Sequence, residues 1–337
     1  FRTSETPSYS PCGEKTTRRH VTAISKHKMD IISLIVVVLG LCLFETISSI
    51  DNAIINAEVL GTMKPKARRW FLVYGLIIAV FMVRGLLPWI IVWVATPGLG
   101  PIDALTATFS SDPAVIEAVE QSAPILLSGG GVFLIFLFFH WLFLEPKNFG
   151  IKGEKFFYQN GIWFYAVVSI ILSVLVWNDL QVNPVMAFGS VIGSTAFFIT
   201  HGFKQNAELA EKKLASSGNL SDISKILYLE VIDATFSIDG VLGAFAFTMS
   251  VPLILLGNGL GAFVVREITI GNIDRIKKYV FLKNGAMYSI LFLGMVMILD
   301  SYGVEIPSYV SPAITFGVVA FFFWKSRVHA KKTQIAS

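Results

Sequence analysis

Two stretches of the chain repeat one acidic pattern inside apolar surroundings: Glu45-Thr-Ile-Ser-Ser49-Ile50-Asp51-Asn52 and Asp233-Ala-Thr-Phe-Ser237-Ile238-Asp239-Gly240. Each consists of an acid, three residues and then Ser-Ile-Asp. A carboxylate at the centre of a membrane-spanning helix costs roughly 2.5–3.5 kcal/mol on insertion scales, so such acids are rare and usually functional. The repetition predicts a duplicated membrane protein with a paired polar site, and we expect a cation to occupy that site.

Composition places the chain in the lipid bilayer. Of its 337 residues 54% are hydrophobic and only 15% are charged, whereas soluble domains carry about 25% charged residues. The apolar stretches approach the roughly 20 residues that cross a bilayer. We therefore expect an all-α polytopic membrane protein with about nine transmembrane helices. The expected spans are 31–60, 70–95, 124–144, 161–177, 184–203, 226–248, 252–270, 284–300 and 308–324. The first is long enough to be tilted or broken at its acidic pattern.

The basic residues indicate the orientation. Lys and Arg gather in alternate connections, and the intervening connections carry none. The basic segments are 61–69, 145–160, 203–225, 271–283 and the C-terminal tail. Because cytoplasmic loops carry the excess of Lys and Arg, the pattern predicts an outside N-terminus and a cytoplasmic C-terminus. The net charge of +4 is therefore a signal of orientation and does not indicate a nucleic-acid partner.

The first residues conflict with this orientation. Segment 1–28 is polar and basic, and Met29-Asp30 resembles a natural start directly before the first span. We expect 1–28 to be a disordered or extraneous tail outside the fold. The other expected units are a transmembrane domain, 29–325, and a basic cytoplasmic tail, 326–337. Within the domain, repeat 1 should cover about 30–144 and repeat 2 about 226–324. The helices 161–203 and the charged cytoplasmic segment 204–225 should lie between the two repeats.

The orientation places the two acidic patterns on antiparallel helices. The first span runs inward and 226–248 runs outward, and the helices that follow carry Arg84 and Arg266 in opposite directions. Two such units in inverted sense are typical of secondary transporters, which bind substrate near the membrane midplane at the repeat interface.

Helical spacing gathers oxygen-bearing side chains around each pattern, because residues three and four apart share a face. Carboxylate, amide and hydroxyl ligands without cysteine suit Mg²⁺, Ca²⁺ or Mn²⁺ better than copper or zinc. The candidate ligands are Glu45, Ser49, Asp51, Asn52, Asn56, Glu230, Asp233, Ser237, Asp239 and Asn258. We expect Asp51 and Asp239 to be central ligands, with Glu45 and Asp233 as ligands or proton acceptors. The competing interpretation is that the acids only pair with Arg84 and Arg266, which we take as structural counter-ions.

Weaker features give further predictions. Asp179 and Asp300 fall near outer helix ends and should be solvated. His140 should face the bundle or the membrane interface, and this is favoured over a role as metal ligand. Gly129-Gly130-Gly131 should allow close helix packing and is not expected to bind phosphate. Asn258 lies between two glycines, which could break its helix or let another backbone approach.

The quoted patterns resemble the TerC-type integral membrane proteins, within a wider group of LysE-like transporters built from inverted three-helix repeats. The matching residues are Ser49-Ile50-Asp51-Asn52, the segment from Asp233 to Asp239, Asn258 and Arg266; Trp70-Phe71-Leu72 and Arg84 resemble an uncharacterised branch of that family. The resemblance implies a divalent-metal exporter, manganese above all, and an association with tellurite resistance. Gly240 departs from the family's usual serine, and the helices between the repeats depart from its three-plus-three plan.

We therefore expect a non-enzymatic transporter of a bacterial inner membrane that exports a divalent cation, with Mn²⁺ favoured, against protons. No Walker-type loop supports direct use of ATP, no organic cofactor is expected, and two cysteines form no disulfide framework. An alternative is a membrane scaffold or a metal-loading component of a tellurite- or stress-resistance complex, which would dock cytoplasmic stress-resistance proteins, and an oligomer is left open. A distant alternative, an intramembrane aspartyl protease, lacks the usual Gly-x-Gly-Asp motif, because Ser237-Ile238 precedes Asp239.

Overall fold

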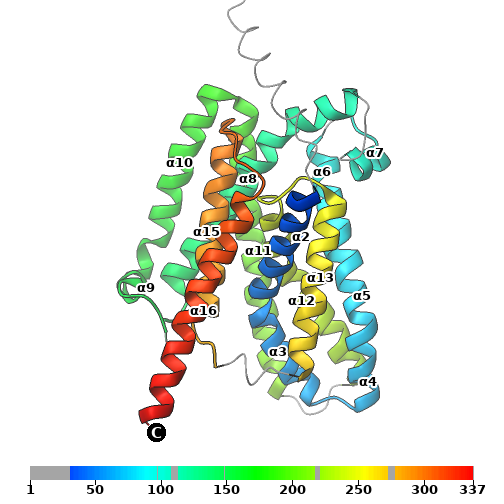
Figure 1. The fold of residues 1–337 in the computed structure, drawn as a ribbon, viewed down its shortest axis with the longest axis vertical. Helices are drawn as coiled ribbons and strands as arrows, with labels where there is room; N and C mark the ends of the chain where they lie inside the picture. The colour runs from blue at the N-terminus through cyan, green and yellow to red at the C-terminus, as the bar shows by residue number, and fades with distance from the viewer. Residues whose placement is uncertain are drawn as a thin grey trace, which may run out of the picture.

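The computed structural model describes residues 31–96, 98–107, 113–147, 149–216, 221–271 and 278–336. Within these ranges every regular element is a helix, and no strand occurs. Segment 1–28, expected to be a tail, lies outside the described residues. Figure 1 shows long helices that run up and down one bundle, with the C-terminus at one end and α7 at the other.

The first half of the chain contains short segments as well as long helices. These elements are α2 (Ile31–Ser48), α3 (Ile50–Gly61), α4 (Pro65–Trp70), η1 (Phe71–Gly75), α5 (Leu76–Ile78), η2 (Ala79–Gly85), α6 (Leu86–Ala95), α7 (Pro101–Thr106), α8 (Pro113–Leu144) and α9 (Glu154–Gln159). The first expected span is indeed interrupted at its acidic pattern, because α2 ends at Ser48 and α3 begins at Ile50. The second expected span, 70–95, is a continuous helical segment in which the π-helical turns η1 and η2 alternate with α-helix.

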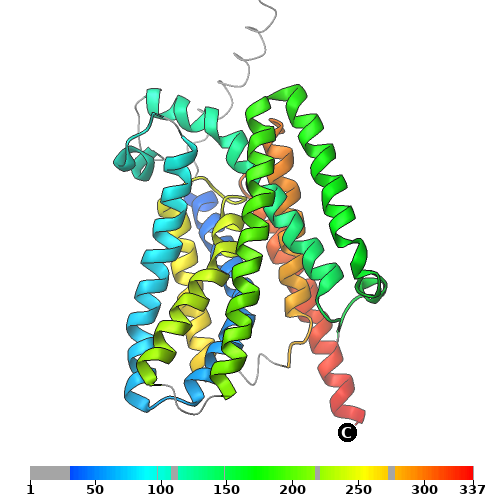
Figure 2. The same cartoon turned by 180° about the vertical axis from the view of Figure 1, so that it is seen from behind.

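The second half consists mainly of long helices. These are η4 (Gly161–Trp163), α10 (Phe164–Val182), α11 (Pro184–Ser216), α12 (Asp222–Ala244), α13 (Val251–Gly271), α15 (Leu282–Ser301) and α16 (Val310–Ala336). The expected cytoplasmic segment after residue 203 begins as a direct continuation of α11. Seen from behind, α12 rises along the bundle while its neighbour α13 descends (Figure 2).

Six segments of the described residues are long and apolar enough to cross a membrane: Ile31–Ser48, Pro113–Leu144, Gly161–Val182, Pro184–Asn206, Val251–Thr269 and Leu282–Ser301. The expected spans at 70–95, 226–248 and 308–324 are helical but fall outside this set. The apolar part of the first, Met82–Ala95, is short, and α12 carries Glu230, Asp233 and Asp239. The protein is therefore an all-helical membrane protein, and the count of nine spans and the orientation stay predictions.

Glycines bring α8 into backbone contact with α11. A Cβ on Gly129 would lie 2.8 Å from the carbonyl oxygen of Gly189, and one on Gly193 would lie 2.8 Å from the Cα of Gly129. Real Cβ atoms do not approach so closely, so these positions require glycine. The prediction that the triple glycine of α8 serves helix packing is confirmed.

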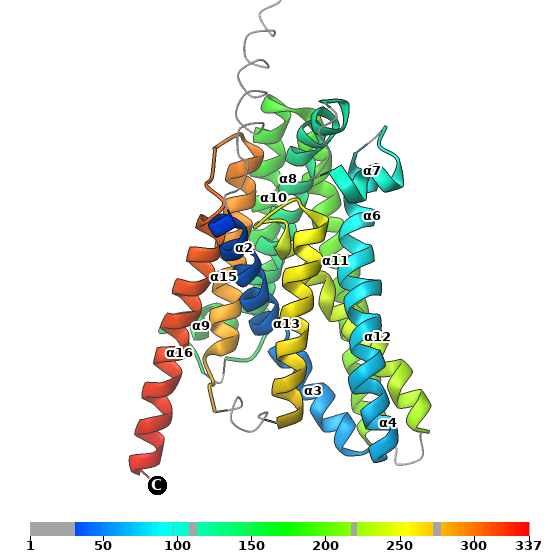
Figure 3. The ribbon, with the colours of Figure 1, turned by 45° about the vertical axis from the view of Figure 1, so that its right-hand side comes forward.

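Glycines also set the contact between α2 and α13, which lie side by side in Figure 3. A Cβ on Gly261 would lie 2.6 Å from the Cβ of Glu45, and Gly257 faces Leu41 in the same way. Helix α13 continues without a break through Asn258. Of the two roles predicted for the glycines around Asn258, close approach of another helix is the one observed.

Candidate functional site

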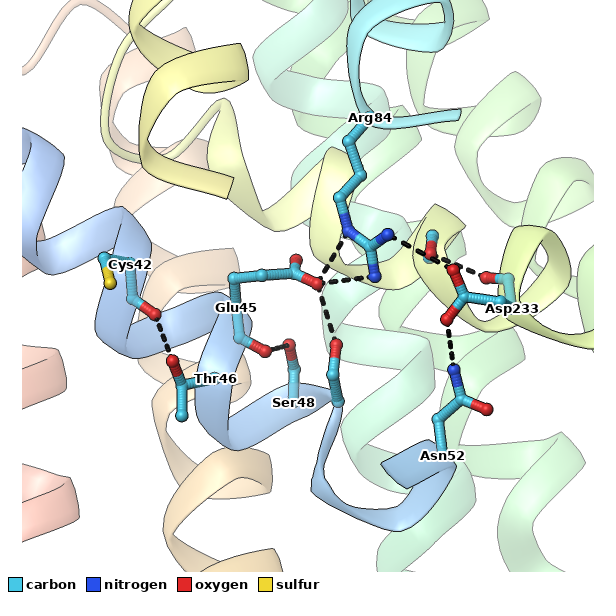
Figure 4. A network of polar contacts seen from close by, with 9 residues as sticks. Cys42, Glu45, Thr46, Ser48, Asn52, Arg84 and Asp233 are labelled. Carbon is cyan, nitrogen blue, oxygen red and sulfur yellow. Dashed lines mark hydrogen bonds and ion pairs between the residues drawn. The ribbon is translucent and has the colours of Figure 1, made fainter. Parts of the chain in front are cut away.

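A buried arginine joins two acids that are far apart in the sequence (Figure 4). Arg84 Nε donates to Glu45 Oε1 at 2.8 Å, and its Nη2 lies 2.8 Å from the same oxygen. Nη1 of Arg84 reaches Asp233 Oδ2 at 3.3 Å. The side chains of Arg84 and Glu45 are 3% and 1% exposed, so this pair is almost completely removed from solvent.

Neutral side chains complete the hydrogen bonding of both acids. Ser49 Oγ donates to Glu45 Oε1 at 2.8 Å, and Asn52 Nδ2 donates to Asp233 Oδ1 at 2.5 Å. Ser237 Oγ instead donates to the backbone carbonyl of Asp233 at 2.6 Å. The structure therefore brings together predicted residues from both acidic patterns, and we call Glu45, Ser49, Asn52, Arg84 and Asp233 the Arg84 network.

The backbone is irregular in two of the segments that contribute to this network. Ser49 lies at the interruption between α2 and α3, and Arg84 is the penultimate residue of the π-helical turn η2. Single π-turns inside α-helices occur frequently at functional sites, because they redirect side chains. No sequence pattern pointed to the π-turn, although the excessive length of the first span predicted the interruption.

The two acidic patterns cross in opposite directions. Asn52 bonds to Asp233, whereas the earlier residue Glu45 faces the later residue Gly240. A Cβ on Gly240 would lie 2.7 Å from Glu45 Oε2, so the glycine makes room for the carboxylate that Arg84 holds. The departure from the usual serine thus has a local steric reason.

A small cavity adjoins the network. Its volume is about 60 Å³, and Asn56, Arg84, Glu230, Asp233 and Arg266 contribute to its lining. Asn56 Oδ1, Glu230 Oε1 and Arg266 Nε are buried without a hydrogen-bond partner among the described residues. Unsatisfied buried polar groups are rare in proteins and require an explanation such as a ligand or ion.

The side chains of Asn258 and Asn52 also have buried polar atoms without a hydrogen-bond partner among the residues that the structure describes. Both polar atoms of the Asn258 side chain are buried without a partner within the described part of the chain, and so is Asn52 Oδ1. Asn258 is 0% exposed. Amide oxygens in this condition can accept a bond from a cation.

Asp239, one of the two predicted central ligands, is not part of the Arg84 network. Asp239 Oδ2 lies 3.5 Å from Lys204 Nζ of α11. The side chain of Asp51 lies outside the described part of the structure, so its role stays a prediction. Arg266 lines the cavity but makes no ion pair among the described residues, unlike Arg84. Within the described ranges no three His, Cys, Asp or Glu side chains are placed to hold a metal ion together.

The prediction that Asp179 is solvated is wrong. Its carboxylate is 1% exposed and accepts hydrogen bonds from Ser190 Oγ at 2.7 Å, Tyr302 OH at 2.6 Å and Ser128 Oγ at 3.4 Å. Burial, with the bond to Asp179, raises the pKa of Tyr302. Sequence reasoning missed this cluster because its donors come from α8, α11 and the turn after α15, and no local pattern connects those segments.

His140 faces the bundle as predicted. It is buried, and its ring lies 3.7 Å, centroid to centroid, from that of His201 on α11. Phe164 and Phe197 pack against the same ring. No sequence pattern indicated that the two histidines meet.

Two relatives of this chain are membrane proteins described as uncharacterised. The chain is 24% identical over 204 residues to an uncharacterised membrane protein of Rickettsia prowazekii (strain Madrid E), covering 57% of this chain and 59% of that protein. It is 25% identical over 204 residues to an uncharacterised membrane protein of Rickettsia felis (strain ATCC VR-1525 / URRWXCal2), covering 59% and 61%. The chain thus spans about three fifths of the length of these curated relatives.

No solved structure matches the chain. Residues 50–333, which include the end of the first acidic pattern from Ile50, the whole second pattern, Arg84 and the residues that line the cavity, match the family described as "Protein of unknown function (DUF475)". The match covers well over half of the sequence. The chain therefore belongs to the DUF475 family.

Proposed function

We propose that the protein is a secondary transporter that moves a small divalent cation across a bacterial inner membrane, with Mn²⁺ the first candidate and Ca²⁺ and Mg²⁺ the others. The observation that carries the proposal is the Arg84 network beside its cavity. The buried carboxylate of Glu45 and the partly buried one of Asp233 share one arginine, and unpartnered oxygens of Asn56 and Glu230 lie beside the network. Charged groups inside membrane segments commonly mark substrate and ion pathways.

Arg84 suggests how the site works. Its guanidinium occupies the space between Glu45 and Asp233, within 2.8 Å and 3.3 Å of their oxygens. A cation that competed for the same oxygens would have to displace it. We infer that the arginine neutralises the acids when no cargo is bound and swings towards the cavity when a cation enters.

The ligand chemistry supports a hard cation. Carboxylate and amide oxygens from Glu45, Asn52, Asn56, Glu230 and Asp233 would form the site, without sulfur or imidazole. Such sets suit Mn²⁺, Ca²⁺ and Mg²⁺. The resemblance of the acidic patterns to TerC-type proteins supports manganese, export and exchange against protons. A non-enzymatic role fits this arrangement.

The proposal is tested with purified full-length protein in liposomes that contain a fluorescent indicator of divalent cations. We expect Mn²⁺ uptake by the unaltered protein and loss of that uptake, by about tenfold or more, in Glu45→Gln and Asp233→Asn. Each variant keeps the side-chain shape but removes a charge whose bond to a cation is worth at least about 1.5 kcal/mol.

Asp179→Asn is the matched control, because it neutralises an equally buried acid outside the network, and it should transport normally. If the unaltered protein moves none of Mn²⁺, Ca²⁺ and Mg²⁺, transport of these ions is ruled out and the scaffold alternative gains support. If Glu45→Gln and Asp233→Asn retain full uptake, the network is structural.

A further inference from the structure

We propose that the rim of the bundle formed by α9 and the last turns of α16 binds the headgroups of negatively charged phospholipids. Four exposed cations, which we call the basic rim, would hold the headgroups: Lys152, Lys155, Arg327 and Lys331. The inference goes beyond the proposed transport function and does not depend on it. The basic rim does not belong to the Arg84 network or line its cavity.

The segment from α9 to the start of α10 exposes large apolar side chains. Phe156 is 64% exposed and Trp163 61%, and Phe157, Tyr158, Ile162 and Tyr165 are exposed as well. A contiguous apolar patch is rare on a surface that faces only water, and it marks a contact with a membrane or another protein. Trp and Tyr in particular are enriched where a membrane meets water. The segment therefore has the composition of a membrane interface.

The position of the segment along the chain indicates the same surroundings. It leads directly into Gly161–Val182, a segment long and apolar enough to cross a membrane, and only 11% of the most apolar stretch of that segment is buried inside the bundle. Most of the stretch therefore faces lipid. Helix α9 lies beside α16 and partway along the bundle, whereas α4 lies at the end of the bundle (Figure 1). This arrangement places α9 where the lipid-facing part of α10 ends.

A buried carboxylate holds α9 against the bundle. Glu154, the first residue of α9, is buried. Its oxygens accept hydrogen bonds from Asn284 Nδ2 at 2.9 Å and 3.2 Å and from Tyr288 OH at 3.1 Å, both on α15. The acid is thus turned away from the surface. A headgroup that approaches α9 meets the exposed cations on either side of the acid, Lys152 and Lys155.

The end of α16 adds positive charge beside α9. Arg327 and Lys331 are exposed and lie about one turn apart on one face of the helix. Helix α16 contains no acidic residue. The ring of Phe149, which precedes α9, lies 5.5 Å from that of His329 on α16. The two parts of the basic rim are therefore neighbours.

Charge and shape together favour an anionic lipid as the occupant. Clusters of Lys and Arg next to a membrane-spanning helix attract negatively charged headgroups. Within the described ranges neither Lys152 nor Lys155 forms an ion pair, so both ammonium groups can bind a phosphate. The acyl chains of the same lipid would cover Ile162 and Trp163. A soluble anion would meet only the cations and leave these apolar side chains exposed.

The proposal is tested with the purified full-length protein in detergent. Phosphatidylglycerol and phosphatidylcholine with identical acyl chains are added, and native mass spectrometry measures the affinity for each lipid. We expect tighter binding of phosphatidylglycerol. Each Lys or Arg near an anionic headgroup contributes about fivefold to the affinity. Lys152→Gln/Lys155→Gln should therefore weaken the binding of phosphatidylglycerol by about twentyfold and leave that of phosphatidylcholine unchanged.

Lys64→Gln/Lys66→Gln is the matched control. It also removes two exposed lysines, but from the start of α4 at the far end of the bundle (Figure 1). It should keep the affinity for phosphatidylglycerol within about twofold. Glu154→Ala keeps both lysines of the rim and removes the bonds to α15, so it should lower the preference for phosphatidylglycerol. Thermal unfolding of each variant checks that the bundle remains folded.

Several outcomes would overturn the proposal. One is equal affinity of the unaltered protein for the two lipids, and another is a preference that survives in the variant with all four cations of the rim replaced by glutamine. A control that loses the preference as fully as Lys152→Gln/Lys155→Gln would also contradict it. If inorganic phosphate displaces phosphatidylglycerol at constant ionic strength, the rim binds a soluble anion and not a lipid. An unchanged preference in Glu154→Ala would refute the role given to that carboxylate.

Discussion

Arg84 is the residue on which the polar interior depends. A buried ion pair is a weak source of stability, because the cost of removing both charges from water can exceed their attraction. Removal of one partner is different, since it leaves a buried charge without compensation. Two acids, Glu45 and Asp233, share this one guanidinium, so both lose their compensation if it is removed.

Arg84→Gln should therefore lower the free energy of unfolding by about 3–5 kcal/mol, the range observed when one partner of a buried pair is removed. The measurement is thermal unfolding of the purified protein in detergent. The triple variant Glu45→Gln/Arg84→Gln/Asp233→Asn has no buried charge in the network and should recover most of the loss. An Arg84→Gln protein that unfolds at the same temperature as the unaltered one would contradict this account.

For single residues, the sequence predicted which polar side chains belong to the buried site better than it predicted the partners that they contact. Helical spacing placed Glu45, Asn52 and Asp233 on polar faces, and the cost of an uncovered acid implied an arginine nearby. Spacing within a helix gives no distance to another helix. The pairing of Asp239 with Lys204 and the burial of Asp179 were missed for this reason.

Among the helices, the contact between α8 and α11 is the most closely fitted. It is made by backbone atoms, because Gly129, Gly189 and Gly193 allow an approach that a side chain would block. Small residues at helix interfaces are a general means of packing in membranes, where lipid is as apolar as a leucine side chain.

Gly193→Ala should destabilise the protein by about 1–3 kcal/mol, the usual cost of inserting a methyl group into a well-packed interior. Gly202→Ala is the matched control on the same helix, because a Cβ at Gly202 has no atom within 4 Å. It should be neutral or slightly stabilising, since alanine favours the helix by about 1 kcal/mol. Equal unfolding temperatures for the two variants would mean that the contact between α8 and α11 is looser than described.

The elements themselves were largely predictable, with two exceptions. Apolar runs and alternating basic loops predicted helices at every expected span, and the length of the first span predicted its interruption. The π-turns η1 and η2 were not predictable, because an α-helix and a π-turn differ in which backbone groups bond to each other and not in their amino-acid composition. The helical continuation of α11 beyond residue 203 was also missed, since its polar residues were expected to form a separate cytoplasmic segment.

For the molecule as a whole, the remaining question is how the bundle sits in the membrane. Figure 1 places α4 at one end of the bundle and the turn between α15 and α16 at the other. The distribution of Lys and Arg predicts that the α4 end faces the cytoplasm.

Single cysteines at exposed positions test this orientation after Cys12 and Cys42 are replaced by serine. In intact cells, Glu305→Cys should react with a membrane-impermeant maleimide, and Lys66→Cys should react only after permeabilisation. Both positions are exposed in the structure, so accessibility within the protein does not differ. The reverse pattern would invert the orientation, and labelling of both from outside would contradict the expected number of crossings.

The glycine contacts of α8 with α11 and of α2 with α13 have a consequence for movement within the bundle. Helices that fit together at such short distances cannot slide along one another without a clash, because packed interfaces have discrete arrangements and do not deform continuously. Any change of conformation during transport would therefore move each of these helix pairs as a rigid unit. The bonds of Arg84 to Glu45 and Asp233, which join α2 to α12, would then be among those that break and re-form between the moving parts.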